Sequence, residues 1–414
     1  MRYLKGFFCS VVCFMIFLWG AIAGAEEIVI GYSGPLSGPA AEYGQDCVNG
    51  VDMAVNELNQ NGGIAVGGKK YKFKLERLDD RSDPTVALNN ARRFKANGAI
   101  AVFNSLLTTV SAIAKINEDK GQEFILMAFT STPKILELKN KLVIFPNPSD
   151  VYRTAFVEWA LSQGYKKCAM MVTMGSYGDD WRKTFKAIYE KKGGTITADK
   201  PVNYYTETDF SAPLTAALKT NPDCMLIGGP SATTALVIEQ ARALGFKGGF
   251  MLIEQAKADV IVKLLKDSKL MGNSIANTTV MSSPRPPSLK NFIPNYEHNY
   301  KRMYTWEAEI NYMFMRALAR AMVAAGTATD IYKIRAAFPQ AYPMTQDKFP
   351  GEHLGITPEG GIYAWGATQT ITNGKFNPTV MYASWPKTQK EWDAVLKMSK
   401  KNKSIVKKWN RPEK

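Results

Sequence analysis

The chain has 414 residues, and at roughly 100–200 residues per domain this length predicts two or three domains rather than one. Apolar residues make up 46% and charged residues 21%, which excludes a disordered chain and a multispanning membrane protein. The two histidines and five cysteines show no metal-ligand spacing, so we expect no metal site and no cofactor. The net charge is +15, and its densest basic run, from Lys397 to Arg411, indicates a solvated tail rather than a nucleic-acid-binding surface.

Residues 1–25 have the order of a secretory signal peptide. Arg2 and Lys5 form a positive region, residues 7–22 carry no charge, and residues 21–25 supply small side chains for cleavage. The alternative is an N-terminal membrane anchor, but residues 7–22 fall short of the ~20 apolar residues that span a bilayer. We therefore expect an exported, periplasmic and soluble protein after cleavage near Ala25.

Three cysteines remain after that cleavage: Cys47, Cys168 and Cys224. Cys168 and Cys224 lie inside apolar runs, where a cysteine usually behaves as a small buried hydrophobic residue. A disulfide cannot be deduced from the sequence, and we expect none.

Apolar strand-like runs alternate with helical patterns along the mature chain. In the first half, strands are predicted at 28–32, 71–78, 99–104, 124–128 and 142–145, and helices at 43–61, 84–97, 108–120 and 133–138. After Pro146 the alternation restarts, with helices at 151–163, 180–192, 211–219 and 233–244 and strands at 168–173, 197–203, 224–228 and 249–253. Strands separated by such helices predict βαβ units, and two runs of them predict an α/β fold with two doubly wound parallel-sheet lobes.

The last third of the chain shows no separate lobe. Residues 282–294 are rich in proline and serine and indicate an irregular excursion, and a helix is predicted at 308–325. Strands at 362–371 and 379–384 follow, with Asn373-Gly374 as the mark of a hairpin between them. These segments must rejoin one lobe or the other, so the chain is expected to cross between the lobes more than once.

Ligands of doubly wound sheets bind beyond the carboxyl ends of the strands, which directs attention to the turns there. In the first lobe Ser105 follows one strand, and the hydroxyl-rich turn that contains Ser131 follows the next. Hydroxyls at the start of a helix with proline in its first position favour an anion such as a carboxylate. In the second lobe the turns carry Tyr177, Ser231 and Glu254.

Each of these residues also has an ordinary structural explanation. Hydroxyls in such turns are usually helix caps, Glu254 is a candidate solvated strand end, and Tyr43 and Tyr177 are candidate surface aromatics. Their arrangement favours function, because anion-binding turns on one lobe would face a carboxylate on the other. A zwitterionic ligand needs that pairing, since neither of its charges can be buried alone.

The segments IVIGYSGPLSGPAAEYGQDCVNGVDMAVNELNQNGGI and LERLDDRSDPTVALNNARRF resemble the type I solute-binding proteins of bacterial ABC transporters. The leucine/isoleucine/valine-binding (branched-chain amino acid) group is the branch they resemble most. The resemblance continues through SYGDD and QARALGFKGGFMLIE and is weakest over 282–350. It implies a type I periplasmic binding protein fold, in which three crossings join two lobes around a ligand cleft. Lobe 1 would comprise residues 26–147 and 281–356, and lobe 2 residues 148–280 and 357–414.

The resemblance also assigns roles to the candidate residues. Ser105 and Ser131 match positions that bind the ligand α-carboxylate, Phe129 matches a position that contributes its backbone, and Glu254 matches the acid that holds the α-amino group. Two further matches, Tyr43 and Tyr177, are aromatics that line the cleft. The chain departs from the leucine binders where it has Pro230 and Ser231 in place of tyrosines. The remaining side-chain contact falls near 305–309, where Trp306 is the candidate.

The predicted function is capture of a small amino acid-like ligand by hinge closure and its delivery to an ABC transporter permease. The alternative is the same fold with another ligand, such as an aromatic carboxylate or an amide, which the departure at Pro230 and Ser231 favours. A third class, an exported enzyme, is disfavoured. The turns carry no histidine, and the chain has no GxGxxG or GxSxG motif and no metal cluster, so we expect no catalytic residues.

Overall fold

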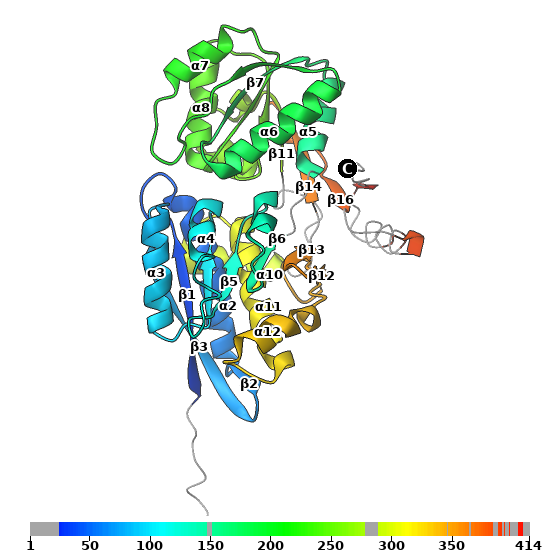
Figure 1. Cartoon of the computed structure of the whole chain (residues 1–414). Coiled ribbons are helices and arrows are strands. Elements are labelled where there is room, and N and C mark those ends of the chain that lie inside the picture. Colours follow the sequence, from blue (N-terminus) through cyan, green and yellow to red (C-terminus); the bar gives the residue numbers. More distant parts are fainter. Residues whose placement is uncertain are drawn as a thin grey trace, which may run out of the picture.

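The computed structural model describes residues 25–146, 151–277, 289–345, 347–363, 366–383, 388–390, 393, 397 and 405–408. These residues form two α/β lobes, placed one above the other in Figure 1, and each lobe is built around its own sheet. The predicted fold class, two doubly wound lobes, is therefore confirmed. The expected signal peptide, apart from Ala25, lies outside the described residues.

The first sheet has the strand order β12-β13-β6-β5-β4-β1-β3-β2. The inner strands, in the spatial order β13, β6, β5, β4, β1 and β3, all run parallel. The edge strands β2 and β12 pair antiparallel with their neighbours. The order along the chain reverses at β1, which pairs with β3 on one side and β4 on the other. The strands are β1 Glu26–Gly34, β2 Ile64–Val66, β3 Lys69–Asp79, β4 Ala101–Asn104, β5 Ile125–Ala128, β6 Val143–Pro146, β12 Gly355–Ile356 and β13 Gly361–Tyr363.

Helices cover both faces of the first sheet. One face packs against α2 and α11 and the other against α3 and α4, and each face has its own hydrophobic cluster. Helices α2 and α11 approach so closely that a Cβ on Gly50 would lie 2.0 Å from the carbonyl oxygen of Ala308. The helices of this lobe are α2 Ala41–Gln60, α3 Pro84–Ala96, α4 Leu107–Ile113, η1 Pro133–Leu138, α10 Leu289–Tyr300, α11 Trp306–Ala325, α12 Ile331–Ala337 and η3 Phe338–Ala341.

The second sheet has the order β17-β16-β14-β11-β10-β9-β7-β8, and β15 pairs with β14. The neighbouring strands β8, β7, β9, β10 and β11 are parallel. Strand β14 runs antiparallel to both β11 and β16. These strands are β7 Lys167–Val172, β8 Thr195–Asp199, β9 Cys224–Gly228, β10 Gly249–Leu252, β11 Asn273–Asn277, β14 Gly366–Thr372, β15 Lys375–Phe376, β16 Val380–Ala383 and β17 Ile405–Lys408.

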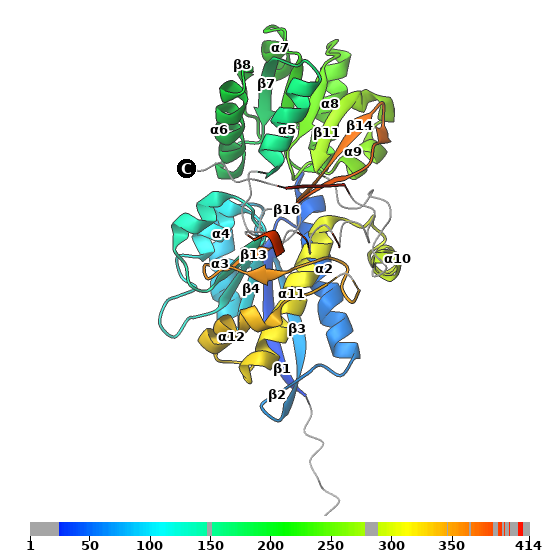
Figure 2. The same cartoon turned by 90° about the vertical axis from the view of Figure 1, so that its right-hand side faces the viewer.

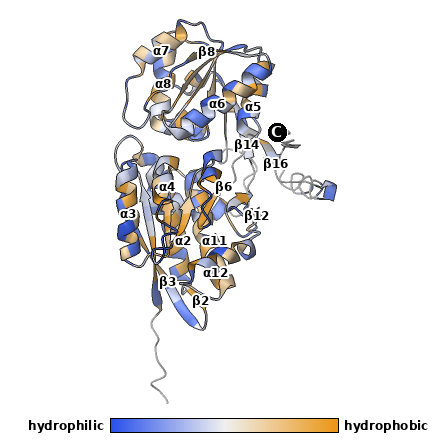
Figure 3. Cartoon of the chain, viewed as in Figure 1, coloured by the Kyte–Doolittle hydropathy of each residue, from blue (hydrophilic) through white to orange (hydrophobic). Residues whose placement is uncertain are grey.

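The helices of the second lobe lie on both sides of this sheet (Figure 2). Hydrophobic residues concentrate along the strands and the helix faces turned toward them (Figure 3), as burial of apolar surface requires. The helices are α5 Val151–Ser162, α6 Ser176–Lys191, α7 Ser211–Leu218, α8 Ser231–Ala243, α9 Ala258–Leu264 and η2 Ser268–Met271. Among the described residues no helix is long and apolar enough to cross a membrane.

Within the described residues the chain changes sheet three times: between β6 and β7, between β11 and β12, and between β13 and β14. The expected boundary at 356/357 falls too early, because β13 pairs with β6 and therefore belongs to the first sheet. The strand expected at 362–371 is consequently two strands, β13 and β14, in different lobes. The expected boundaries at 147/148 and 280/281 lie outside the described residues.

Two other segments differ from the prediction. The excursion expected at 282–294 is described only from Leu289 onward, where it forms α10 with Pro294 inside the helix. Apolar residues anchor α10, since Phe292 and Ile293 are buried in the first lobe's core. The basic tail is not wholly a solvated terminus, because β17 pairs parallel with β16. The turn at Asn373-Gly374 is present, with positive φ of 50° and 78°, but it joins β14 to the short strand β15. The strand expected at 379–384 corresponds to β16, which pairs antiparallel with another part of β14.

The cysteines Cys47, Cys168 and Cys224 are buried as free thiols. Cys168 and Cys224 lie opposite each other on the neighbouring strands β7 and β9.

Candidate functional site

A buried polar network shapes the carboxyl edge of the first sheet. Asp80 accepts hydrogen bonds from the Ser33 hydroxyl (3.0 Å) and from the Asn104 side-chain amide (3.1 Å), and burial raises the pKa of Asp80 to about 6. The Thr109 hydroxyl donates to the Asn104 side-chain oxygen at 2.6 Å. Because these bonds join the ends of β1, β3 and β4 to α4, they fix the turn that carries Ser105.

Three of the predicted residues meet beside this turn. The Tyr43 hydroxyl, on α2, donates to the Ser105 carbonyl oxygen at 2.9 Å, and the Tyr43 ring stacks on Phe129 with centroids 6.2 Å apart. The Ser105 hydroxyl is buried and finds no hydrogen-bond partner among the described residues. A buried hydroxyl without a partner is costly and uncommon in native proteins, so this one is suited to bind a ligand atom.

In the second lobe, hydrogen bonds hold the loop that follows β10, residues 253–257, in one shape. The backbone N–H of Gln255 donates to the Tyr177 hydroxyl at 3.3 Å, and the Tyr205 hydroxyl donates to the Gln255 side-chain oxygen at 3.0 Å. The backbone N–H of Lys257 donates to the Ser231 hydroxyl at 3.1 Å. Tyr177 and Ser231 therefore support this loop, and the Ser231 hydroxyl already accepts one hydrogen bond from it.

The loop presents Glu254 to the first lobe, where its carboxylate accepts a hydrogen bond from the Ser131 hydroxyl. Burial raises the pKa of Glu254, whereas the bond from Ser131 and the positive charge of Arg153 act in the opposite direction. Arg153 is itself buried, pairs with Asp180, and lies with its guanidinium 4.5 Å from the ring centroid of Trp181. A partly desolvated carboxylate of this kind is suited to bind a cationic group.

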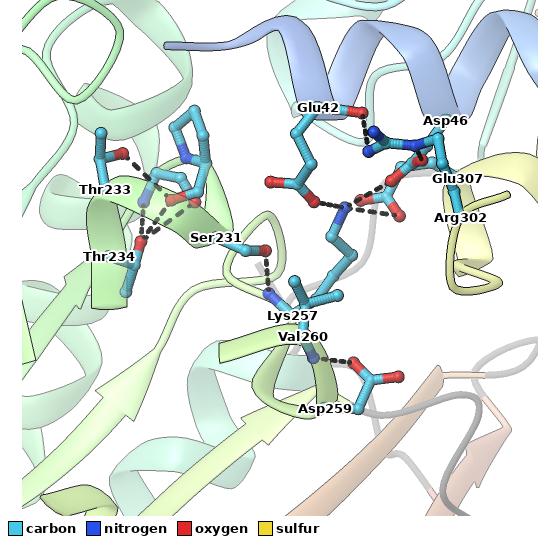
Figure 4. A network of polar contacts seen from close by, with 12 residues as sticks. Glu42, Asp46, Ser231, Thr233, Thr234, Lys257, Asp259, Val260, Arg302 and Glu307 are labelled. Atoms are coloured by element: carbon cyan, nitrogen blue, oxygen red, sulfur yellow. Dashed lines mark hydrogen bonds and ion pairs between the residues drawn. The ribbon is translucent and has the colours of Figure 1, made fainter. Parts of the chain in front are cut away.

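The same loop also sends Lys257 across the lobe boundary, into an acidic cluster that Figure 4 shows. The Lys257 ammonium lies 2.7 Å from Glu42, 3.2 Å from Asp46 and 3.4 Å from Glu307, and the Arg302 guanidinium lies 3.0 Å from Asp46. Only 3% of the Lys257 side chain, 1% of Asp46 and none of Glu307 is exposed. Burial raises the pKa of Glu307 to about 8, although Lys257 opposes this effect.

Helix positions explain how the acidic cluster forms. Glu42 and Asp46 are four residues apart at the beginning of α2, which places them on one face, and Glu307 lies in the first turn of α11. Carboxylates are stabilised near helix N-termini, where unpaired backbone N–H groups carry partial positive charge. The close packing of α2 on α11 brings the two helix starts together.

The structure brings the predicted residues to the two facing edges of the lobes. Tyr43, Ser105, Phe129 and Ser131 lie on the first lobe, and Tyr177, Ser231 and Glu254 on the second; the Ser131–Glu254 bond joins the two groups. Their contact with a ligand stays a prediction. Near 305–309, the hydroxyl of Thr305 and the indole N–H of Trp306 are buried without a partner among the described residues.

Sequence reasoning missed the charged residues that surround the predicted site. The spacing of Glu42 and Asp46 was a usable signal, because residues four apart share a helix face. The position of Lys257 just after Glu254 was another. Nothing local in the sequence indicated that Lys257 would meet Asp46, which is 211 residues away along the chain. The missed residues are Glu42, Asp46, Arg153, Lys257, Arg302 and Glu307.

Comparison with known proteins places this architecture in a family. Residues 27–362 match the family model of the periplasmic binding proteins. The Leu/Ile/Val-binding protein of Escherichia coli (strain K12) is 28% identical over 233 residues, which are 56% of this chain and 62% of that protein. The match therefore spans less than two thirds of this relative.

Solved structures share the fold. A leucine binding protein from Thermotoga maritima gives a TM-score of 0.71 at 23% identity and covers 85% of this chain and 98% of that one. A solute binding protein of an ABC transporter from R. palustris, in complex with benzoate, gives a TM-score of 0.71 at 16% identity and covers 86% and 95%. The family match covers most of the chain, and the fold agrees with it. The chain therefore belongs to the periplasmic binding protein family and has the type I fold that these solved structures share.

Proposed function

We propose that this protein is the extracytoplasmic substrate-binding component of an ABC transporter. It captures a small amino acid-like ligand between its lobes by hinge closure and delivers the ligand to a membrane permease. The observation that carries the proposal is the position of Glu254, a partly buried carboxylate on one lobe that directly faces Ser131 on the other.

The chemistry at the lobe boundary suits a zwitterion. On the first lobe, the Ser105 hydroxyl has no protein partner among the described residues and provides a donor for a carboxylate. The Ser131 hydroxyl donates to Glu254 in this structure and becomes a second donor only when the ligand takes its place on Glu254. On the second lobe, Glu254 provides the acceptor for an ammonium group. A charged hydrogen bond of this kind is roughly twice as strong as a neutral one. The E. coli relative, named a Leu/Ile/Val-binding protein, supports an amino acid ligand.

A second candidate function is binding of an aromatic carboxylate or an amide by the same fold. The benzoate complex of the structural neighbour from R. palustris supports it. So do Pro230 and Ser231, which replace the tyrosines of the leucine binders; here the Ser231 hydroxyl supports a loop. The unpartnered polar groups of Thr305 and Trp306 favour a ligand more polar than leucine.

Export and location are part of the proposal. Residues 1–25 would direct the chain to the periplasm as a signal peptide, and the mature chain would act there without spanning the membrane. No nucleic acid, cofactor or catalytic step enters this function. Incubation of the mature chain with each ligand that it binds should leave the ligand unchanged, as judged by mass spectrometry.

A thermal-shift screen of the mature chain tests the proposal. The chain is first freed of co-purified ligand by unfolding and refolding, and is then heated with single amino acids, aromatic carboxylates or amides. A ligand that binds only the folded state adds ~2.7 kcal/mol of stability at a hundredfold excess over Kd. Stabilisation by an amino acid supports the first function, and stabilisation only by benzoate-like acids or amides supports the second. No stabilisation by any of the three classes contradicts both.

A further inference from the structure

We infer that Lys257 is a positioning residue that latches the two lobes together. Its ammonium binds the acidic cluster of Glu42, Asp46 and Glu307 on the first lobe and so holds the loop that carries Glu254 in its closed position. The inference rests on the proposed function in one respect, that the closed position is the ligand-holding one. The ion pairs themselves do not depend on which ligand binds.

Hydrogen bonds make the loop after β10, residues 253–257, stiff. Gln255 is held by Tyr177 and Tyr205, the Lys257 backbone is held by Ser231, and the Ala256 N–H donates to the Ile253 carbonyl at 2.8 Å. Because the loop is stiff, its residues move together as one unit. Whatever holds the Lys257 side chain against the first lobe also fixes where the Glu254 carboxylate lies.

This loop carries two side chains of opposite charge, and both contact the first lobe. Glu254 accepts a bond from Ser131, and the Lys257 ammonium enters the acidic cluster. Next to the proposed ligand site, the two lobes therefore contact each other through protein side chains alone, without a ligand. Closure is then stabilised by ion pairs as well as by ligand.

On each side of the latch, one group is held within its own lobe. Asp46 is held by Arg302 at 3.0 Å and by the Tyr296 hydroxyl at 3.3 Å, all in the first lobe. On the other side, Ser231 holds the Lys257 backbone. Asp46 and the Lys257 backbone therefore keep partners within their own lobes when the Lys257 ion pairs are lost, so we expect that loss to act on closure more than on folding.

Electrostatics sets the size of the effect. Loss of one partner from a desolvated charge pair is strongly unfavourable, because the remaining charges stay buried without compensation. Lobe opening returns the carboxylates to water and relieves that cost. Lys257→Met should therefore lower the ratio of closed to open molecules at least ~30-fold.

The test measures the radius of gyration by small-angle scattering on the mature chain, freed of ligand and with none added. Lys257→Met is expected to expand the protein relative to wild type, and Lys257→Arg, which keeps the charge, should remain close to wild type. The matched control is Lys192→Met. Lys192 pairs with Glu158 at 3.1 Å within the second lobe, where both side chains are about half exposed, so its loss should leave the radius unchanged.

A double variant separates the latch from a general loss of structure. Glu42→Gln removes the carboxylate nearest to Lys257 and should also expand the protein. Lys257→Met combined with Glu42→Gln restores the wild-type net charge of the cluster, so it should expand the protein less than the sum of the two changes. Additive effects, or a radius for Lys257→Met equal to wild type, would overturn the inference. A protein that shows the latch yet binds nothing in the ligand screen would instead overturn the proposed function.

Discussion

In the proposed function, Glu254 and Ser105 at the lobe boundary contribute different interactions to an amino acid ligand. Glu254→Gln keeps the size and removes the charge, which leaves a bound ammonium without its partner. Loss of one member of such a pair typically costs about 2–5 kcal/mol, so affinity should fall at least ~30-fold. Ser105→Ala removes one hydrogen bond to a charged group, worth ~1.5–3 kcal/mol, and should do less. Titration calorimetry with the amino acid found in the screen measures both.

The same two variants distinguish the ligand classes. If the ligand is a carboxylate without an amine, Glu254→Gln should leave binding unchanged or improve it, because a buried negative charge has been removed. Ser105→Ala should still weaken binding in that case. If neither change alters affinity, the assigned site is wrong.

His353 provides a pH-dependent contribution to stability that lies away from the Glu254 loop. Its ring packs against Phe314 and Tyr342, and burial lowers its pKa to about 3. Because the pKa is lower in the folded state than the ordinary value near 6.5, the unfolded chain takes up the proton first as pH falls. Stability should be full above about pH 6.5 and decline below it toward pH 3, by up to ~1.4 kcal/mol per pH unit.

Urea unfolding of wild type and His353→Gln at pH 7, 5.5 and 4.5 measures this contribution. The variant should be less stable at pH 7, since its packing is imperfect, but its stability should fall less steeply between pH 6.5 and 4.5. Equal slopes for the two proteins would show that His353 is not the group that titrates.

The predictable part of the candidate site was the part near strand ends. Because ligands of parallel sheets bind at carboxyl ends, the strands alone directed attention to Ser105, Ser131 and Glu254. The cluster around Lys257 was not predictable in this way. It depends on how two helix starts and a distant loop meet in space, and no local pattern encodes contacts between residues 211 positions apart.

Among the secondary-structure elements, strong periodicity made the long helices and buried strands predictable. Helix α2 was predicted to within a few residues at each end because its apolar residues repeat on one face. Helix α10 was missed, since Pro294 and the preceding prolines suggested irregular structure while its buried aromatic residues supplied the stabilising contacts. The split between β13 and β14 was hidden because only two residues separate the two strands in the sequence, so they look like one strand.

Strand β17 is the element whose role differs most from the expected solvated tail. Ile405–Lys408 pairs with β16 at the end of the second sheet, several strands away from β10 and the Glu254 loop. Deletion of residues 399–414 should therefore destabilise the protein by roughly 1–3 kcal/mol, the net value of a few hydrogen bonds, while ligand affinity stays nearly constant. Thermal unfolding and calorimetry on the truncated chain test the two parts. A large loss of affinity would place the tail at the ligand site.

At the scale of the whole molecule, the three changes of sheet make the lobes two bodies joined by a few chain segments. Such connections usually allow hinge closure around a ligand that binds between the bodies. A ligand shifts this equilibrium only by its preference for the closed state. In the proposed function, contacts with Ser131 and Glu254 provide that preference. Saturation with the ligand found in the screen should therefore reduce the radius of gyration measured by small-angle scattering.

The latch refines that prediction, because ligand and Lys257 stabilise the same closed state. In wild type the ion pairs already favour the closed state. Fewer molecules are therefore open before ligand is added, and ligand can close only those. In Lys257→Met more molecules start open, and saturating ligand should produce a larger decrease in radius than in wild type, although more ligand is needed to reach it. Tight binding with an unchanged radius in both proteins would contradict closure itself. Equal decreases in the two proteins would leave closure standing and remove the contribution of Lys257.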